Sequence, residues 1–160
     1  MKIRRFQPGD EGQIAQLFHD TIHTVNRRDY TPRQLAAWAP ADLNFRDWLT
    51  VCASRFTLVA DDGGRIAGFG ELEANGHIDC FYCHRDYQGQ GVGRQLYQGL
   101  ENQARTASLQ RLFVEASITA RPFFERMGFV TLVAQSVACR GEIFLNYAME
   151  KWLSFNPNAF

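Results

Sequence analysis

The sequence predicts a single α+β (α/β) domain over residues 1–160, in which strands and helices are interleaved along the chain. Segments rich in β-branched and aromatic residues alternate with segments whose apolar residues recur at helical spacing. Turns that contain glycine or asparagine separate neighbouring strands. The hydrophobic content of 46% and charged content of 21% are typical of a globular chain, and 160 residues suffice for one well-buried core.

The first half of the chain is expected to hold one strand, three helical segments and a hairpin. A strand over residues 1–7 ends at the turn Pro8-Gly9-Asp10 and is followed by an amphipathic helix carrying Ile14, Leu17, Phe18, Ile22 and Val25. Thr31 and Pro32 are typical of a helix N-cap and first turn, so a short helix is expected over residues 31–38, before Pro40. A third helical segment is predicted over residues 45–53, and Asp61-Asp62-Gly63-Gly64 indicates a hairpin between strands 56–60 and 65–73.

The second half begins with a turn at Asn75-Gly76, which joins strand 65–73 to a strand over residues 77–83. A helix over residues 94–107, a strand over 111–116 and a short helix over 121–127 follow, and Gly128 is expected to end the short helix. Strands 129–137 and 142–151 form a closing hairpin around Arg140-Gly141. No repeat, linker or low-complexity segment interrupts this order.

The stretch Gln88-Gly89-Gln90-Gly91-Val92-Gly93 lies between the predicted strand 77–83 and the predicted helix 94–107. A strand that turns through three glycines into a helix presents free backbone N–H groups at the positive end of the helix dipole, which suits a phosphate. No Lys-Ser or Lys-Thr follows, which excludes a P-loop, and the G-x-G-x-G spacing differs from the G-x-G-x-x-G of dinucleotide folds. The loop therefore indicates a different class of phosphate binder.

The spacing of Gln88, Gly91 and Gly93 resembles the acyl-CoA pyrophosphate loop of the GCN5-related N-acetyltransferases (GNAT family). About 30 residues downstream, the segment from Pro122 to Phe129 is similar to the family segment Phe-Tyr-Glu-Lys-x-Gly-Phe. The overall pattern resembles small bacterial acetyltransferases of the YafP-like kind. This resemblance covers nearly the whole chain and implies a mixed, mostly antiparallel sheet of six to seven strands, splayed at the fourth and fifth strands and flanked by helices on both faces.

The resemblance implies an enzyme that moves an acetyl group from acetyl-CoA to an amine of a small molecule or peptide by direct attack. Two alternatives remain open from the sequence. One is an acyl-CoA-binding sensor without turnover, to which Phe124 gives weight. The other is an acetyltransferase toxin acting on charged tRNA, which the neutral balance of 17 basic and 17 acidic residues disfavours unless Arg27, Arg28 and Arg33 cluster.

Cofactor binding is assigned by the resemblance to the strand before the loop, to the loop, and to two positions further on. The amides of the loop would cap the pyrophosphate, and the backbone near Phe81 and Cys83 would pair with the pantetheine arm. Ser117 stands where many relatives have an asparagine. The full set is Phe81, Tyr82, Cys83, Gln88, Gly89, Gln90, Gly91, Val92, Gly93, Arg94, Ser117 and Phe124.

The catalytic candidates are His77 and Asp79 on the strand before the loop, and Glu71, with Glu73 as a neighbour, on the strand before that. Strand periodicity predicts that His77 and Asp79 share one face with Phe81 and Cys83. An imidazole accepts an ammonium proton at neutral pH, and a nearby carboxylate orients it. The family often places a tyrosine at the position of Phe124 to protonate the CoA thiolate. Phenylalanine carries no such proton, so either the role is vacant and the thiolate leaves unaided, or Tyr147 or Tyr82 takes it over.

The acceptor is expected to bind at the polar and aromatic segment between the first two helices, where the family varies. The candidates there are His23, Asn26, Asp29, Tyr30 and Trp38, through the Asp29 carboxylate and aromatic faces. A solvated loop anchored by one tryptophan explains the same residues equally well.

Charge and cysteine content bound the partners. The neutral balance argues against nucleic acid, and the absence of an 18-residue apolar run or an apolar leader predicts a cytoplasmic chain that binds no membrane. Cys80-x-x-Cys83 invites a zinc interpretation, but residues three apart on a strand point to opposite faces and no further ligand pair is present, so no metal is expected. Cys52, Cys80, Cys83 and Cys139 are predicted to be reduced thiols. A homodimer is compatible with the resemblance.

Overall fold

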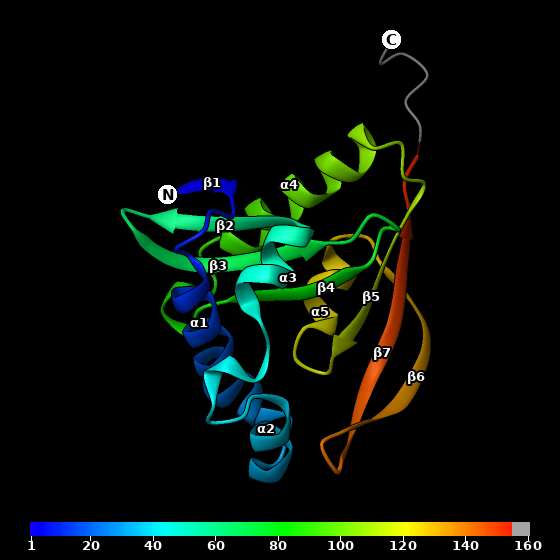
Figure 1. Cartoon of the computed structure of the whole chain (residues 1–160). Helices are drawn as coiled ribbons and strands as arrows, with labels where there is room; N and C mark the ends of the chain where they lie inside the picture. Colours follow the sequence, from blue (N-terminus) through cyan, green and yellow to red (C-terminus); the bar gives the residue numbers. More distant parts are fainter. Residues whose placement is uncertain (155–160) are drawn as a thin grey trace.

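The computed structural model describes residues 1–154 and leaves residues 155–160 undescribed, so the predicted single domain over residues 1–160 is described without its last six residues. The elements, in chain order, are β1 (Lys2–Arg5), α1 (Glu11–Thr24), α2 (Pro32–Trp38), α3 (Trp48–Ser54), β2 (Phe56–Asp62), β3 (Arg65–Leu72), β4 (Ile78–Cys83), α4 (Val92–Thr106), β5 (Arg111–Ser117), α5 (Arg121–Arg126), β6 (Val130–Cys139) and β7 (Glu142–Trp152). Short 3-10 turns lie at Asn26–Arg28, Leu43–Phe45 and Arg85–Tyr87. The mixed α+β prediction is confirmed (Figure 1).

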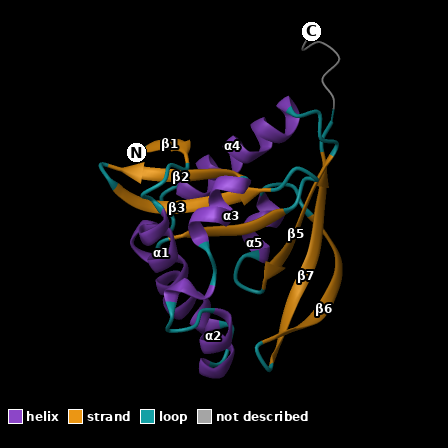
Figure 2. Ribbon diagram, viewed as in Figure 1, coloured by secondary structure: helices purple, strands orange, loops and turns teal. Residues whose placement is uncertain are grey.

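The strands form two antiparallel parts, β1-β2-β3-β4 and β5-β7-β6. Figure 2 shows β4 and β5 meeting at one end and diverging towards the other. The two parts meet at a single parallel bridge between His77 and Phe113, where the Phe113 N–H also donates to the Gly76 carbonyl at 3.1 Å. The predicted splay between the fourth and fifth strands is confirmed, and within residues 1–154 it leaves one edge of β4 without a strand partner.

Helices cover both faces of the N-terminal sheet, and each face has its own core. Helix α4 packs Leu96 and Leu100 against one face, together with residues of β5 and α5. Helices α1, α2 and α3 cover the other face, where Ile14 and Trp48 lie beside Phe69. The amphipathic pattern expected for α1 is confirmed by its buried residues, Ile14, Ala15, Leu17, Phe18, Thr21 and Ile22.

Local signals placed several boundaries correctly. Thr31 caps α2 through a capping box with Gln34, and Pro32 is in its first turn. The β2–β3 turn and the β6–β7 turn contain Gly63, Gly64, Arg140 and Gly141, all at positive φ. Helix α4 begins two residues before its predicted start, because Gly91 adopts φ +81° as the N-cap and Val92 already packs in the core.

A bulge in β4 overturns one expectation from strand periodicity. Gly70 pairs with Phe81 and Leu72 pairs with Ile78, so Glu71 alone lies opposite both Asp79 and Cys80. Because of this extra residue, the alternation of side chains between the two faces of the sheet is interrupted between Ile78 and Phe81.

Phe81 and Cys83 therefore pack on the α4 side, whereas the Asp79 carboxylate bonds to Arg46 and Arg55 beside α3. The prediction that His77 and Asp79 share a face with Phe81 and Cys83 is wrong for Asp79.

Candidate active site

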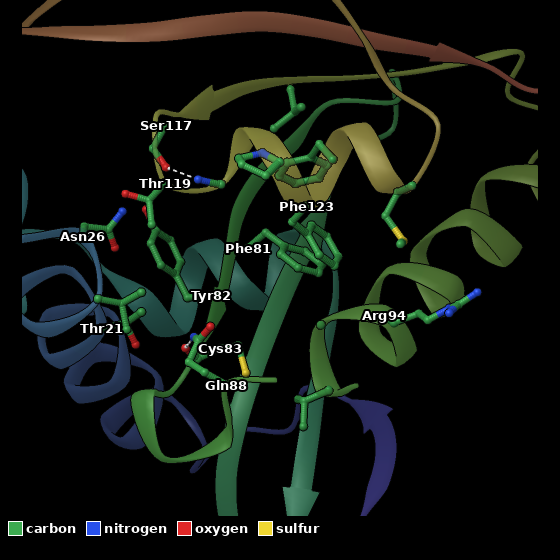
Figure 3. Close-up of a pocket in the computed structure, with 18 of the residues that line it drawn as sticks. Thr21, Asn26, Phe81, Tyr82, Cys83, Gln88, Arg94, Ser117, Thr119 and Phe123 are labelled. Atoms are coloured by element: carbon green, nitrogen blue, oxygen red, sulfur yellow. Dashed lines mark hydrogen bonds between the residues drawn. The ribbon is translucent and has the colours of Figure 1, made fainter. Parts of the chain in front are cut away.

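A cleft of about 710 Å³ lies where β4 and β5 diverge (Figure 3). Its walls come from the end of α1 and the following turn, the end of β4, the glycine loop with the start of α4, and the segment from β5 to α5. The residues that line it are Thr21, Val25, Asn26, Arg28, Trp38, Asp79, Phe81, Tyr82, Cys83, Tyr87, Gln88, Gly89, Gly91, Val92, Gly93, Arg94, Val114, Glu115, Ser117, Thr119, Ala120, Pro122, Phe123, Phe124, Arg126 and Met127.

The glycine loop is tied to the end of β4 and then turns into α4. The Gln88 side-chain amide donates to the Cys83 carbonyl at 2.5 Å, which fixes the start of the loop. Gly89 and Gly91 adopt φ +71° and +81°, and an added Cβ at either position would meet no atom within 4 Å. Glycine is needed here for its backbone conformation, because other residues are strained at positive φ.

The N–H groups of residues 89–94 point to no acceptor in the part of the chain that the structure describes. The first hydrogen bond that α4 receives at this end is from the Gln95 N–H to the Gly91 carbonyl, at 3.1 Å. Six successive free N–H groups at the N-terminus of a 15-residue helix form a site for an anion. The loop thus has the geometry predicted from its glycine spacing.

Aromatic side chains form the wall between the loop and α5. The Phe81 ring stacks on Phe123 with centroids 5.2 Å apart, and Phe124 packs edge-on against both. The free edge of β4 runs along the same wall. An unpaired strand edge beside an apolar wall can hold an extended chain through main-chain hydrogen bonds.

The opposite end of the cleft is polar and partly aromatic. Thr21 is 3% exposed, and its hydroxyl has no hydrogen-bond partner within residues 1–154. Asn26 is 5% exposed and lines the same end, beside Trp38 and Tyr82. Figure 3 shows Thr21, Asn26 and Tyr82 on this side and Arg94 on the other. Burial raises the pKa of Tyr82 well above its usual value, so its hydroxyl stays protonated.

Two carboxylates, Asp79 from β4 and Glu115 from β5, line the cleft. Asp79 is bonded by Arg46 and Arg55, and Glu115 lies 2.5 Å from Nε2 of His77. None of these three cationic side chains lines the cleft. The carboxylates therefore face the cleft while their partners lie behind them.

A model of the acetyltransferase (GNAT) domain matches residues 26–151. The chain belongs to the GNAT family. It is 35% identical over 150 residues to the uncharacterized N-acetyltransferase YafP of Escherichia coli K12, covering 93% of this chain and 94% of YafP. The predicted membership and the likeness to YafP-like proteins are both confirmed, and membership favours an acetyl-CoA-dependent N-acetyltransferase over the sensor.

Solved structures show the same fold. A GCN5-related N-acetyltransferase of Rhodopseudomonas palustris superposes with a TM-score of 0.89 at 33% identity, covering 95% of both chains. The PaiA N-acetyltransferase of Thermoplasma acidophilum, solved with coenzyme A, gives a TM-score of 0.78 at 14% identity, covering 95% of this chain and 98% of that one. The YncA protein of Salmonella typhimurium, described with acetyl-CoA, gives 0.68 at 18% identity, covering 100% and 99%.

Eleven of the twelve cofactor residues assigned from the GNAT resemblance line the cleft. The exception is Gln90, whose side chain donates to the Asp86 carbonyl at 3.0 Å. The Ser117 hydroxyl accepts from the Ala120 N–H at 3.0 Å, so it also holds the turn before α5.

The GNAT catalytic candidates are less well placed. Glu71 is 0% exposed, bonds to Arg46 and Arg55 and does not line the cleft, so neither an amine nor a relaying water reaches it. Tyr147 does not line the cleft either; its ring packs under the Arg121 guanidinium, 4.2 Å from its centroid. These positions argue against both predicted roles, because neither side chain lines the cleft.

His77 lies behind the cleft wall. Its Nδ1 is 2.9 Å from Glu73 and its Nε2 is 2.5 Å from Glu115, and the ring stacks on Phe113 with centroids 5.0 Å apart. Burial lowers the pKa of His77, but the hydrogen bonds that its ring donates to the Glu73 and Glu115 carboxylates outweigh burial, and the pKa is raised. A histidine with both nitrogens engaged does not act directly on a substrate in the cleft.

Of the predicted acceptor residues, Asn26 and Trp38 line the cleft and the other three do not. His23 lies 2.8 Å from the Ala39 carbonyl. Asp29 accepts from the Thr119 hydroxyl at 2.7 Å. The Tyr30 hydroxyl donates to the Leu145 carbonyl and accepts from the Ile118 N–H. Asp29 and Tyr30 thus attach this segment to the loop after β5 and to β7.

The sequence interpretation missed Thr21, Glu115, Thr119 and Phe123 as cleft residues. A usable signal existed for Glu115: Leu112, Val114 and Ala116 are apolar, so the alternate positions of β5 point away from the α4 core. No comparable signal existed for Thr21, since it lies among the buried residues of an amphipathic helix.

Within residues 1–154, no helix has the length and hydrophobicity needed to span a membrane.

Cys80 and Cys83 pack into cores on opposite faces of the sheet, as their spacing predicted.

Proposed function

We propose that this chain acetylates an amine of a small molecule or peptide, with the acetyl-CoA phosphates on the glycine loop and the amine at the α1 end of the cleft. The observation that carries the proposal is the row of free N–H groups over residues 89–94, at one end of a cleft that continues along the unpaired edge of β4. Acetyl-CoA supplies a thioester-activated acetyl group.

The chain's own residues meet the needs of such a cofactor along the whole cleft. Gly89 to Arg94 offer N–H donors and a helix dipole to the pyrophosphate. The edge of β4 at Phe81 to Cys83 offers main-chain partners for an extended arm, and Phe123 and Phe124 cover it with apolar surface. An arm held in this way would end between β4 and β5, near the polar end of the cleft.

The polar end supports an amine as the acceptor. Asp79 and Glu115 present carboxylates to the cleft, and Trp38 and Tyr82 present aromatic side chains, both of which favour a cationic group. With Phe124 at the family's tyrosine position, two phenols line the cleft. The Tyr87 hydroxyl donates to Asp62 at 2.7 Å, so Tyr82 is the phenol proposed to protonate the leaving thiolate. The cytoplasmic location, the single domain over residues 1–160 and the homodimer stay predictions.

The test is acetyl-CoA binding and turnover by the full-length protein. A thermal shift with acetyl-CoA, followed by free-thiol detection against a panel of amino acids, polyamines, aminoglycosides and short peptides, is expected to show both stabilisation and amine-dependent thiol release. Stabilisation without thiol release with any amine would favour the sensor, and no stabilisation would contradict the assignment of the loop.

A further inference from the structure

Glu115 occupies an unusual position at the junction of the two sheet parts. It lies on β5 two residues after Phe113, which forms the bridge to His77, so it is at the point where β4 and β5 begin to separate. Its side chain is 45% exposed and lines the cleft. A carboxylate at this point is beside both strands that bound the cleft and is still open to solvent.

The His77 ring fixes the orientation of this carboxylate. Nε2 of His77 engages Oε2 of Glu115 at 2.5 Å, Nδ1 engages Glu73 at 2.9 Å, and the ring stacks on Phe113. The main-chain N–H of His77 donates to Oδ1 of Asn75 at 3.1 Å, and this bond also fixes the backbone that carries the ring. The other Glu115 oxygen, Oε1, accepts no hydrogen bond from any described residue and is free to take one from a ligand.

The ion-pair network behind this wall of the cleft contains one more carboxylate than cations. Four carboxylates (Glu71, Glu73, Asp79 and Glu115) form one connected network with Arg46, Arg55 and His77, which supply three cations when the His77 ring is protonated. Its net charge is therefore −1, and the cleft-lining members are both carboxylates. A bound ammonium group would complete the network from the cleft side.

A second, independent feature of the same cleft also points to a ligand. Thr21 is 97% buried, yet its hydroxyl has no partner among the described residues, and it lines the cleft at the polar end. A buried hydroxyl without a hydrogen-bond partner costs stability, and a hydrogen bond with a polar group of a bound ligand would satisfy it. The carboxylates thus belong to a cleft that is built to hold a polar ligand.

From these contacts we infer that Glu115 is the catalytic base of the proposed acetyl transfer, and that His77 is the positioning residue that holds it in place. The inference rests on the proposed function. An ammonium N–H donates to Oε1 of Glu115 and transfers its proton there, which leaves a neutral amine. The amine nitrogen then bonds to the acetyl carbon, the carbon–sulfur bond breaks, and its electron pair leaves on sulfur. The nitrogen loses its second proton to the departing thiolate, which gives the neutral amide and the CoA thiol. Exposure of Glu115 lets the proton pass to solvent.

The test compares Glu115→Gln with Glu142→Gln, a glutamate paired with the exposed Arg33 far along the chain and outside the cleft. Acetyl-CoA binding is expected to be unchanged in both variants, because the loop and the β4 edge are intact. With any amine that the wild type acetylates, kcat of Glu115→Gln should fall about 100-fold or more. If the wild type does not bind acetyl-CoA, the proposed function is overturned. If it binds and Glu115→Gln has an unchanged kcat, this inference alone is overturned.

A binding experiment tests the same carboxylate without turnover. Pairs of an amine and its matching alcohol, such as ethanolamine with ethylene glycol and tyramine with tyrosol, are compared by thermal shift in the presence of CoA. The wild type is expected to be stabilised more by at least one amine than by its alcohol, and this difference should vanish in Glu115→Gln. No amine preference in the wild type, or a preference that Glu115→Gln retains, would contradict the inference.

The positioning role of His77 has its own spectroscopic readout. The chain has four histidines, and His77→Gln identifies the ring signals of His77 in nitrogen-resolved NMR spectra. Both ring N–H protons should persist to higher pH in the wild type than in Glu115→Gln. His77→Gln should lower kcat with little change in KM or in acetyl-CoA binding. An unaltered His77 titration in Glu115→Gln would refute the contact on which the role depends.

Discussion

Nη2 of Arg46 lies 3.0 Å from Oε2 of Glu71, a carboxylate with no exposed surface. Nη1 of Arg55 approaches the same oxygen at 2.9 Å. These contacts make Glu71 the buried centre of an ion-pair network under the β4 bulge. They also explain why Glu71, although it lies on a strand near the cleft, stabilises the fold and does not line the cleft.

Replacing Glu71 with glutamine is expected to destabilise the protein by roughly 3–5 kcal/mol, because two arginines lose their buried counter-charge. The matched variant Glu142→Gln breaks an exposed pair with Arg33 and should cost less than about 1 kcal/mol. Urea unfolding of both variants measures the difference. Equal stabilities would show that the buried network adds nothing to the folded state.

Replacing Gly91 with alanine should weaken acetyl-CoA binding. The residue needs φ +81°, which costs alanine about 1–2 kcal/mol, and relaxation of the strain would turn the loop N–H groups away from the phosphates. Gly12 lies in helix α1 with open space around it, so Gly12→Ala should leave binding intact and raise stability by about 0.5–1 kcal/mol. Titration calorimetry with acetyl-CoA and thermal unfolding check both. Tight binding by Gly91→Ala would contradict the role of the loop.

Replacing Gly76 with alanine is expected to damage the junction of the two sheet parts. Its φ is +96°, and an added Cβ would lie 2.2 Å from the Arg111 carbonyl oxygen, so the backbone must move. A loss of at least about 3 kcal/mol is expected, within the range of severe single substitutions. Gly63→Ala has a positive φ but open surroundings and should lose only about 1–2 kcal/mol. The unfolding midpoints of the two variants measure these losses of stability. Similar losses in both variants would mean that the junction tolerates the shift of the backbone.

Stability should depend on pH through His77. Its pKa is raised in the folded protein, because the hydrogen bonds to Glu73 and Glu115 outweigh burial. A raised pKa means that the stabilisation is complete below the unfolded pKa, about 6.5, and is lost as pH rises through the folded pKa. The stability gap between the wild type and His77→Gln should therefore narrow between pH 6 and pH 9 in urea unfolding. A gap that is constant across this range would be the contrary result.

The Cys83 thiol should react slowly with alkylating reagents at neutral pH. Burial raises its pKa to about 11, so little thiolate is present, although the residue lines the cleft. Iodoacetamide labelling followed by mass spectrometry should show a rate that rises steadily from pH 7 to pH 10 and falls when acetyl-CoA is added. Cys83→Ala identifies the labelled peptide. Rapid labelling at pH 7 would contradict the shielded position of this thiol.

The sequence by itself determined the features whose physics is local. The glycines at 89, 91 and 93 specify a loop that only a few backbone conformations satisfy, Thr31 and Pro32 specify a helix start, and Gly63-Gly64 and Arg140-Gly141 specify tight turns. Each signal depends on residues within about five positions of one another. The order of the elements follows from these signals, whereas the family and most of the cofactor wall follow from the resemblance of residues 88–93 and 122–129 to GNAT segments.

Only the tertiary structure decided which charged residues face the cleft. One extra residue in β4 turned Asp79 away from Phe81 and Cys83 and towards Arg46 and Arg55. The approach of β5 to β4 brought Glu115 to His77, 38 positions earlier in the chain. Strand register and long-range packing determine these contacts. Periodicity along one strand does not reveal them, because the partners of a side chain lie on other strands and decide whether it is buried, paired or free.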